Sequence, residues 1–326
     1  MKQSLLSSAE AAAYGAKLSG AESVPHYPQP LATEIIKKVE KLGGIDAFDM
    51  PSQSDALNAA IGCSLSGRRT FLATSFLDGF ADAVRVAKFQ LPVVAVDVSR
   101  ASGTFSPERN LAPFIDAGWL VFVPESNQEI IDMIIMCYRL CEDSKVMLPA
   151  VVSIDHADFY EPVLLPSEQI IKNFLQRKLK KIEPKKPANY VPKSHDTKGA
   201  VETAAKLHAK INEIWKKKFH RTYGLAEPYM VEDAERVIVT AGLHSPTAKA
   251  VVASLRKNGE KVGLLRIASL CPFPETAVAN LSGSVAVVDS SELLYNKVSR
   301  RIKCSSFLLH SPSERDFMHV LQSMKK

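Results

Sequence analysis

Few residues in this sequence have the type and spacing that chemistry requires. Cys137 and Cys141 stand four positions apart on an apolar stretch with a helical pattern, which would place two soft metal ligands on one face. No Cys-x-x-Cys pair accompanies them, so packing in a core is favoured over a zinc or iron–sulfur site. We therefore expect no metal ligands here, and five reduced thiols: Cys63, Cys137, Cys141, Cys271 and Cys304.

His156 is the histidine best placed for acid–base chemistry, because it follows a predicted buried strand and would emerge where ligands gather. A structural role is favoured, since no partner can be identified in the sequence. The patterns Gly-x-Gly-x-x-Gly after a strand and Gly-Lys-Ser/Thr are absent, which disfavours dinucleotide-binding and P-loop enzymes. The segment Gly62–Gly67 resembles a nucleophile elbow, but its spacing is one residue too long and it lies in a helical pattern.

Short β-branched runs alternate with amphipathic helical patterns through the first half of the chain. The predicted strands are Ile45–Met50, Thr70–Ser75, Pro92–Ser99, Trp119–Glu125 and Pro149–Asp155. The predicted helices are Leu31–Leu42, Gln53–Ser66, Asp78–Lys88 and Asn127–Cys141. This alternation is typical of a mostly parallel sheet with helices on both faces, in which ligands bind at the carboxyl ends of strands.

A second, smaller α/β pattern follows. Its predicted strands are Arg236–Ala241, Lys261–Ser269 and Ser284–Ser290, and its predicted helices are Thr247–Lys257 and Glu292–Arg300. We expect three parts: an α/β domain over residues 1–165, a basic linker and helix over 166–229, and a second α/β domain over 230–326.

The positive charge is concentrated between the two α/β patterns. Lys172–Arg221 holds 15 Lys or Arg against 4 Asp or Glu, whereas the whole chain carries a formal charge of +6. Prolines in Lys178–Lys198 predict an extended linker, and Gly199–Phe219 has the pattern of a basic helix. A solvated connector is favoured. The alternative is a clamp on an acidic partner or on nucleic acid, which no aromatic interleaving or nucleic-acid motif supports. A nucleic-acid-binding module would predict salt-dependent association with DNA or RNA.

Length and composition agree with this division. The 326 residues are enough for about two domains, and 46% hydrophobic with 23% charged residues is ordinary for a soluble protein. No apolar run approaches the roughly 18–20 residues of a membrane-spanning helix. The N-terminus has no apolar segment of the signal-peptide type, so we expect a cytoplasmic protein that does not enter a membrane.

Several segments, taken in order, resemble one family. They are Glu10–Lys17, Tyr27–Ile35, Ala60–Ser64, Arg69–Ser75, Leu91–Val94, Ala117–Trp119, Glu125–Glu129 and Leu148–Val151, followed by Val231–Glu235, Thr247–Val251, Gly263–Ile267 and Cys271–Pro274. This series is similar to the α subunit of pyruvate and other 2-oxoacid:ferredoxin oxidoreductases. The resemblance implies an α/β fold: a parallel-sheet domain of the pyrimidine-binding type found in thiamine-diphosphate enzymes, and a smaller α/β domain like the C-terminal domain of transketolase.

The resemblance also implies an activity, a cofactor and partners. Members oxidatively decarboxylate a 2-oxoacid with coenzyme A and pass electrons to ferredoxin, using thiamine diphosphate shared with a β subunit that binds the diphosphate and magnesium. Iron–sulfur clusters lie in β or δ subunits, which agrees with the lack of a cluster motif here. We therefore expect a dimer or hetero-oligomer containing β and further γ or δ subunits, and an inactive chain in isolation.

Two positions depart from the family pattern at the implied catalytic site. The family's Tyr-Pro-Ile-Thr-Pro reads Tyr27–Leu31 here, which puts Pro30 where a substrate-contacting threonine stands. Pro30 has neither a hydroxyl group nor an amide hydrogen. Gln53 takes the place of the glutamate that exchanges a proton with the aminopyrimidine ring of the cofactor. Because an amide does not titrate, the resemblance implies a weakened activation of the cofactor.

Other implied contacts are retained or altered. Gln53 and Ser75 are the implied cofactor-binding residues, and Arg100 matches the arginine that holds the substrate carboxylate, for which a guanidinium can make two hydrogen bonds. An ordinary strand-end ion pair is the alternative for Arg100.

Two loops differ from the family. Phe76–Gly79 differs in sequence, and the connection between Arg100 and Trp119 is shorter. Two hypotheses follow: a catalytic α-type subunit, or a non-catalytic paralogue that acts as a scaffold or regulator.

Overall fold

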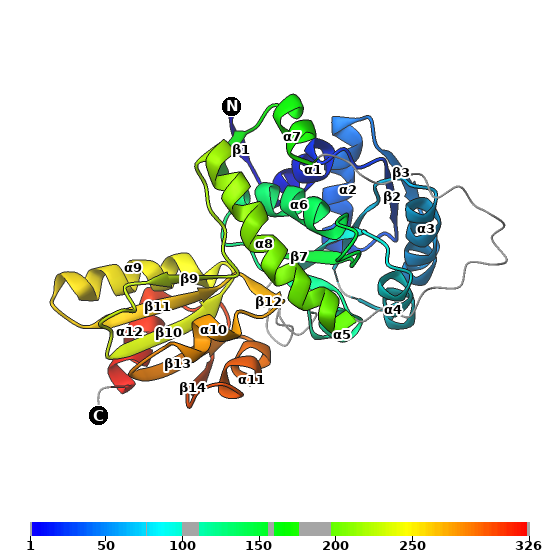
Figure 1. Ribbon diagram of the computed structural model, residues 1–326. Coiled ribbons are helices and arrows are strands. Elements are labelled where there is room, and N and C mark those ends of the chain that lie inside the picture. The colour runs from blue at the N-terminus through cyan, green and yellow to red at the C-terminus, as the bar shows by residue number, and fades with distance from the viewer. Residues whose placement is uncertain (1, 76, 100–110, 156–159, 176–196, 325–326) are drawn as a thin grey trace.

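The computed structural model describes residues 2–75, 77–99, 111–155, 160–175 and 197–324. Its N-terminal unit alternates strands and helices as the sequence predicts (Figure 1). The strands are β1 (Lys2–Leu6), β2 (Ser23–His26), β3 (Asp46–Asp49), β4 (Phe71–Thr74), β5 (Val94–Ser99), β6 (Leu120–Phe122), β7 (Ala150–Asp155) and β8 (Glu161–Leu165). The helices are α1 (Ser8–Leu18), α2 (Pro30–Leu42), α3 (Gln53–Leu65), α4 (Phe80–Lys88), α5 (Leu111–Asp116), α6 (Asn127–Cys141), α7 (Glu168–Leu175) and α8 (Thr197–Phe219).

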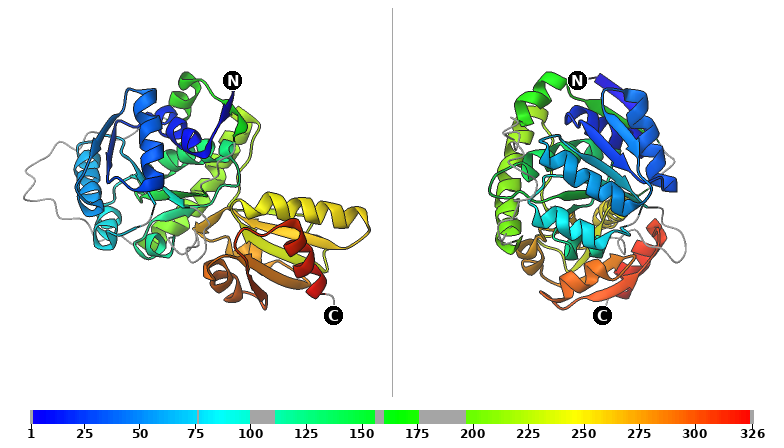
Figure 2. Two further views of the ribbon diagram at one scale, coloured as in Figure 1. Left: turned by 180° about the vertical axis from the view of Figure 1, so that it is seen from behind. Right: turned by 90° about the vertical axis from the view of Figure 1, so that its right-hand side faces the viewer.

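The C-terminal unit is smaller and lies beside the first (Figure 2). Its strands are β9 (Ala226–Tyr229), β10 (Arg236–Ala241), β11 (Val262–Ile267), β12 (Ser269–Cys271), β13 (Ser284–Asp289) and β14 (Ser305–Leu308). Its helices are α9 (His244–Lys257), α10 (Glu275–Ala279), α11 (Leu293–Ser299) and α12 (Glu314–Ser323). Four of its strands form a parallel sheet in the order β14-β13-β10-β11, and β9 pairs antiparallel with β11 at one edge.

The main sheet of the N-terminal unit has the order β12-β6-β7-β5-β4, and all its strands except β12 are parallel. Beside it, β2 and β3 form a short parallel pair in which His26 lies opposite Asp49. An isolated parallel bridge between Ser23 and Thr70 links β2 to the start of β4. The carboxyl ends of β2, β3 and β4 are therefore held near one another, where ligands of parallel α/β proteins bind.

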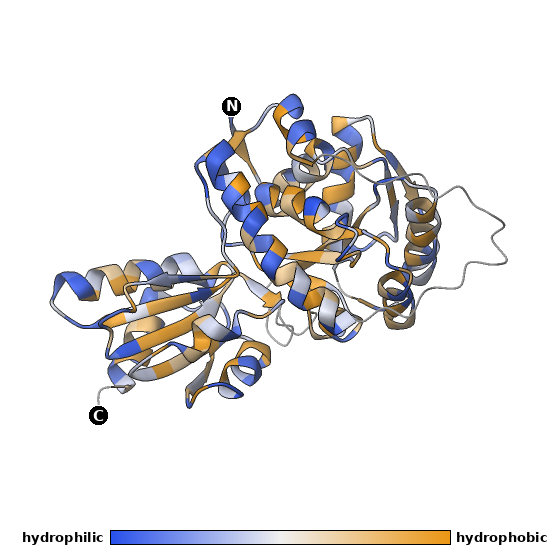
Figure 3. Cartoon of the chain, in the orientation of Figure 1, coloured by the Kyte–Doolittle hydropathy of each residue, from blue (hydrophilic) through white to orange (hydrophobic). Residues whose placement is uncertain are grey.

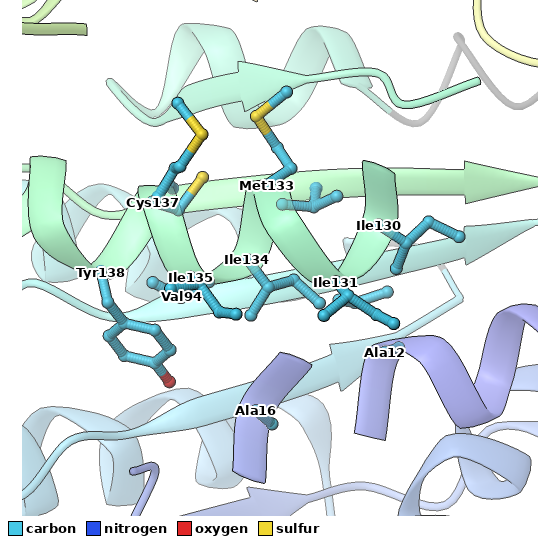
Figure 4. Packing of buried hydrophobic residues seen from close by; sticks show 14 of the residues in the cluster. Ala12, Ala16, Val94, Ile130, Ile131, Met133, Ile134, Ile135, Cys137 and Tyr138 are labelled. Carbon is cyan, nitrogen blue, oxygen red and sulfur yellow. The ribbon is translucent and has the colours of Figure 1, made fainter. Parts of the chain in front are cut away.

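Helix α6 forms the centre of the N-terminal core. Thirteen of its 15 residues are buried, because it packs against α1, α7, α8 and the strands β5 and β7. Figure 4 shows Ile131 and Ile134 on the side of α6 that faces α1. Cys137 and Cys141 are buried within this core as free thiols, and burial raises the pKa of both. The interpretation of this pair as core residues is confirmed.

Two helical glycines differ in the space around them, and alanine substitutions at the two positions should therefore change stability in opposite directions. A Cβ on Gly15 of α1 would lie 2.9 Å from Ile134 Cδ1, whereas a Cβ on Gly62 of α3 would meet no atom within 4 Å. We expect Gly15→Ala to lower the free energy of unfolding by about 1–3 kcal/mol through overpacking. Gly62→Ala should raise it by about 0.5–1 kcal/mol through helix propensity. Urea unfolding of both variants tests this, and a stabilised Gly15→Ala variant would contradict the close packing of α1 on α6.

The basic segment is only partly solvated. Helix α8 buries one apolar stripe in the N-terminal core, where Trp215 makes an edge contact with Phe174 at 4.8 Å between ring centroids. Figure 3 shows the alternating hydrophilic and hydrophobic stripes of α8. Exposed lysines, including Lys206 and Lys210, lie on its other side. The predicted helix Gly199–Phe219 is confirmed, and most of Lys178–Lys198 lies outside the described residues.

One strand from the C-terminal part of the chain, β12, joins the N-terminal sheet. The single predicted strand Lys261–Ser269 is interrupted at Ala268, so that β11 belongs to the C-terminal sheet and β12 pairs with β6 of the N-terminal sheet. Val123 N–H donates to Ala268 O at 2.8 Å and helps to hold this crossing. The continuous strand expected from the sequence is therefore wrong at its end, because two different sheets satisfy its backbone groups.

A cluster of charges joins the units beside this crossing. Arg266 on β11 is 1% exposed and lies within 2.7 Å of Glu129, 3.1 Å of Glu125 and 3.0 Å of Glu227. Glu129 is almost fully buried in the first turn of α6. Burial raises the pKa of Glu129 to about 7 despite the attraction of Arg266. We call these four residues the Arg266 cluster.

The fold class expected from the sequence is confirmed, and so are most predicted elements within a few residues. Within the described residues, no helix combines the length and apolar character needed to cross a membrane. In the same residues, no group of three or more metal-binding side chains comes together.

Candidate functional site

Three side chains meet at the carboxyl end of β4. Gln53 is the first residue of α3, whose N-cap Ser52 accepts a hydrogen bond from the Asp55 N–H. Thr74 is the last residue of β4, and Gln29 precedes the first residue of α2. All three side chains are at least nine-tenths buried. The family resemblance gave Gln53 as a predicted site residue, but Gln29 and Thr74 were not among the predicted site residues.

A directional series of hydrogen bonds connects these side chains. Gln53 Nε2 donates to Thr74 Oγ1 at 2.6 Å, and Thr74 Oγ1 donates to Gln29 Oε1 at 2.9 Å. The backbone N–H of Ser75 donates to the same Gln29 oxygen at 2.8 Å. Because the Thr74 oxygen accepts a hydrogen bond from Gln53, the Thr74 hydroxyl group donates its own hydrogen to Gln29.

The other end of the Gln53 amide holds the loop before α4. Gln53 Oε1 accepts a hydrogen bond from the Gly79 N–H at 3.0 Å and another from the Asp78 N–H. A backbone N–H can only donate, so these contacts fix the amide oxygen on the loop side. Gln53 therefore ties α3 to β4 and to the loop that the sequence identified as divergent.

The remaining predicted site residues have different surroundings. Ser75 Oγ accepts a hydrogen bond from the Ala32 N–H at 3.1 Å, which joins the end of β4 to the first turn of α2. Pro30 is the first residue of α2 and is exposed, a position that suits proline because the N–H there has no helical partner. Arg100 and His156 lie outside the described residues. Among the described ones, Gln53 and Ser75 meet at the end of β4, and Pro30 lies two residues before Ala32, which donates to Ser75.

A small cavity lies against this network. Its volume is about 20 Å³, enough for about one water molecule. None of its described lining residues is Asp or Glu. They are Pro25, His26, Tyr27, Gln29, Gln53, Ala56, Leu57, Leu72, Ala73, Thr74, Leu77, Ala95, Phe114 and Trp119.

His26 is a lining residue that sequence reasoning missed. It is 5% exposed, and its Nε2 lies 2.7 Å from Asp49 Oδ1, on the neighbouring strand of the β2–β3 pair. Each residue ends a strand of only four residues, and one of those strands contains Pro25. No sequence periodicity links the two positions, so only their pairing in the sheet reveals the contact.

The residues present do not fit the proton exchange that thiamine diphosphate requires from this domain in the family the motifs resemble. That exchange needs an ionisable carboxyl group, and the described wall of the cavity contains none. Gln53 is neutral, and its amide oxygen is engaged by two backbone N–H groups. The site therefore offers hydrogen bonds of fixed direction without a titrating acid at this position.

Comparisons with known proteins give a consistent picture. Residues 9–233 match the family described as pyruvate flavodoxin/ferredoxin oxidoreductase, thiamine diphosphate binding, and residues 234–310 match pyruvate:ferredoxin oxidoreductase core domain II. The chain is 30% identical over 338 residues to pyruvate synthase subunit PorA of Methanocaldococcus jannaschii. That alignment covers 93% of this chain and 87% of the relative.

Solved structures share the fold. A 2-oxoglutarate:ferredoxin oxidoreductase from Magnetococcus marinus matches 99% of this chain with a TM-score of 0.76 and 16% identity. A transketolase from Campylobacter jejuni matches 98% of this chain with a TM-score of 0.58 and 13% identity. The chain spans 65% and 45% of those two chains, respectively. Together with the ordered family matches, these findings confirm the resemblance found in the motifs: the chain belongs to the pyruvate flavodoxin/ferredoxin oxidoreductase family as an α-type subunit.

Proposed function

We propose that this chain forms an active site for a 2-oxoacid together with a β-type subunit that binds the diphosphate and magnesium of thiamine diphosphate. The observation that carries the proposal is the match to the thiamine-diphosphate-binding domain over residues 9–233, followed by core domain II. In this proposal electrons pass to ferredoxin through iron–sulfur clusters of the partner subunits, and the complex is cytoplasmic.

The proposal assigns roles to the predicted site residues. Gln53 faces the cofactor where other members carry an acid, Ser75 holds the adjoining backbone, and Arg100 binds the substrate carboxylate. Pro30 cannot make the substrate hydrogen bond that the resemblance assigns to a threonine at its position. We divide the chain into residues 1–165 for the cofactor-facing domain, 166–229 for the basic connector and helix, and 230–326 for the second α/β domain.

A second function is favoured by one observation. The Gln53 amide is engaged at both ends within this chain, by Thr74 on one side and by Gly79 and Asp78 on the other. A side chain in that state serves the fold without any cofactor. This arrangement supports a non-catalytic paralogue that keeps the partner surface and acts as a scaffold or regulator.

Co-expression with a β-type subunit tests the proposal. The purified complex should reduce an artificial electron acceptor in the presence of a 2-oxoacid, coenzyme A, thiamine diphosphate and magnesium, and neither chain should do so alone. A stable complex with no cofactor-dependent turnover on any common 2-oxoacid would favour the scaffold function. Failure of the two chains to associate would contradict both functions.

A further inference from the structure

The two-stranded sheet of β1 and β8 has an apolar outer face. Leu5 lies directly opposite Pro162, and Leu164 lies two residues further along the same face of β8. All three residues are exposed, Leu5 by 62% and Leu164 by 40%. A sheet face that meets only water usually carries polar side chains. Three apolar side chains together on such a face therefore indicate a surface for contact with another molecule.

The backbone of β1 is open along one edge. Leu164 N–H donates to Gln128 Oε1 at 2.6 Å, and Gln128 Nε2 donates to Leu164 O at 3.4 Å, so both backbone groups of Leu164 point away from β1. Bonding direction alternates along an antiparallel pair, so Gln3, which lies opposite Leu164, also points its N–H and C=O groups away from β8. The same holds for Leu5, whose partner Pro162 has no N–H to donate. Among the described residues, no strand pairs with the edge of β1 that these groups face.

A groove of about 230 Å³ adjoins β1 at the outer end of the N-terminal unit, where β1 lies beside α1 (Figure 1). This volume is large enough for one leucine-sized or aromatic side chain. The groove is mostly apolar, with charged groups from α1 and α2. Its lining residues are Leu5, Leu6, Glu10, Ala13, Tyr14, Lys38, Lys41 and Leu42.

The charges beside β1 favour an acidic partner. Lys38 Nζ lies 2.9 Å from Glu10 Oε1, so these two charges offset each other. Lys41 is exposed at the groove and forms no ion pair with a residue that the structure describes, and Lys2 is exposed on β1 itself. The strand and the groove together are therefore positively charged. A second copy of this chain would bring the same positive charges to the edge, which disfavours pairing between two β1 strands.

We propose that β1 accepts an extended acidic segment of a partner protein as a further strand of the β1–β8 sheet. The backbone of the segment bonds to Gln3 and Leu5, one of its apolar side chains covers Leu5 and enters the groove, and its carboxylates lie near Lys2 and Lys41. Strand addition takes affinity from backbone hydrogen bonds and selectivity from side-chain contacts. This surface shares no residue with the cavity beside Gln53, so the inference goes beyond the proposed function.

Binding of a synthetic peptide to the full chain tests the proposal. The probe is a blocked, fluorescein-labelled peptide in which aspartate alternates with leucine, so that one face of its strand is acidic and the other apolar. We expect saturable binding, measured by fluorescence anisotropy, that weakens as the salt concentration rises. NMR should show slower amide hydrogen exchange at Gln3 and Leu5 when the peptide is bound.

Two altered peptides separate the backbone contribution from the charge. A peptide with N-methyl groups on alternate backbone nitrogens keeps its side chains but cannot complete a strand pairing. A peptide with lysine in place of aspartate keeps the backbone and reverses the charge. Each should bind at least tenfold more weakly than the probe.

Substitutions in the chain assign the binding to the edge and to the groove. Gln3→Pro removes an N–H from the open edge and none of the bonds to β8, so the chain should fold and bind the probe at least tenfold more weakly. Lys41→Glu should weaken binding to a similar extent. Lys257→Glu makes the same charge change at an exposed lysine of α9 and should leave the affinity within about twofold.

Several results would overturn the proposal. They are absence of probe binding, equal binding by folded Gln3→Pro protein, and equal binding of the N-methylated peptide, which would place the contact in side chains alone. A dimer of the chain in analytical ultracentrifugation that Gln3→Pro dissociates would also overturn it, because β1 would then pair with a second copy. Turnover of the complex with a β-type subunit tests the proposed function separately, since the binding experiments use this chain alone.

Discussion

Replacing Gln53 by glutamate is expected to raise the kcat of the complex with a β-type subunit by about 10²- to 10⁴-fold, the usual contribution of general acid–base catalysis. The new carboxyl group can titrate, which the amide cannot. The fold should tolerate the change, because one carboxylate oxygen can accept from Gly79 N–H and the other from the Thr74 hydroxyl group. The Thr74 hydrogen then turns away from Gln29, whose oxygen still accepts from the Ser75 N–H. Dye reduction at saturating 2-oxoacid measures the effect.

Several comparisons make this result interpretable. Gln322→Glu adds the same charge on the surface and should leave kcat unchanged. Adding Pro30→Thr to Gln53→Glu restores both implied family residues, and revival of an inactive complex by the pair would show decay from an active ancestor. An active wild-type complex that both substitutions impair would contradict the expected gain and indicate a specialised enzyme in which the amide is required.

The largest effect on stability is expected from Arg266→Met. This change removes the Arg266 cation from the nearly fully buried Glu129 and from Glu227, whereas Glu125 keeps Lys249 at 3.3 Å. Breaking a buried ion pair from one side typically costs about 3–5 kcal/mol, because the remaining charge is not solvated. Since Arg266 lies on β11 and Glu129 on α6, the loss should also weaken the contact between the two units. Urea unfolding followed by circular dichroism measures the free energy of unfolding.

An exposed ion pair provides the control for Arg266. Arg301 and Glu275 form a pair whose side chains are 44% and 56% exposed, and Arg301→Met should cost less than about 1 kcal/mol. The double variant Arg266→Met with Glu129→Gln should recover part of the lost stability, because it removes one of the stranded charges. A loss below about 1 kcal/mol for Arg266→Met would contradict a buried ionic contact between the units.

Stability should also depend on pH through Glu129. Burial raises the pKa of its carboxyl group in the folded chain to about 7, above the 4.5 of an ordinary glutamate. The folded state therefore binds more protons than the unfolded state between these two pKa values. As a result, the contribution of Glu129 to the free energy of unfolding falls as pH rises from about 4.5 to about 7. Glu129→Gln should flatten that part of the profile. An unchanged slope in the variant would contradict the raised pKa.

Local sequence signals were sufficient for most elements. The predicted helix Asn127–Cys141 has the observed bounds of α6, since the N-cap Ser126 marks its start and its apolar pattern ends before Glu142 and Asp143. Helix α1 was not predicted, although Ser7 and Glu10 form a capping box at its start. The short strands β2 and β3 were harder, because four residues carry too little periodicity to distinguish a strand from a loop.

The sequence by itself determined the order of strands and helices, the family resemblance and the presence of an amide at position 53, because these depend on neighbouring residues or on motifs. Only the tertiary structure decided what that amide contacts, that His26 lies beside Asp49, that Gln29 lines the same cavity as Gln53, and that Arg266 lies beside three glutamates. Each of these contacts joins residues on different elements. Their geometry depends on strand register and helix packing, and the hydrophobic pattern of a single segment contains no record of either.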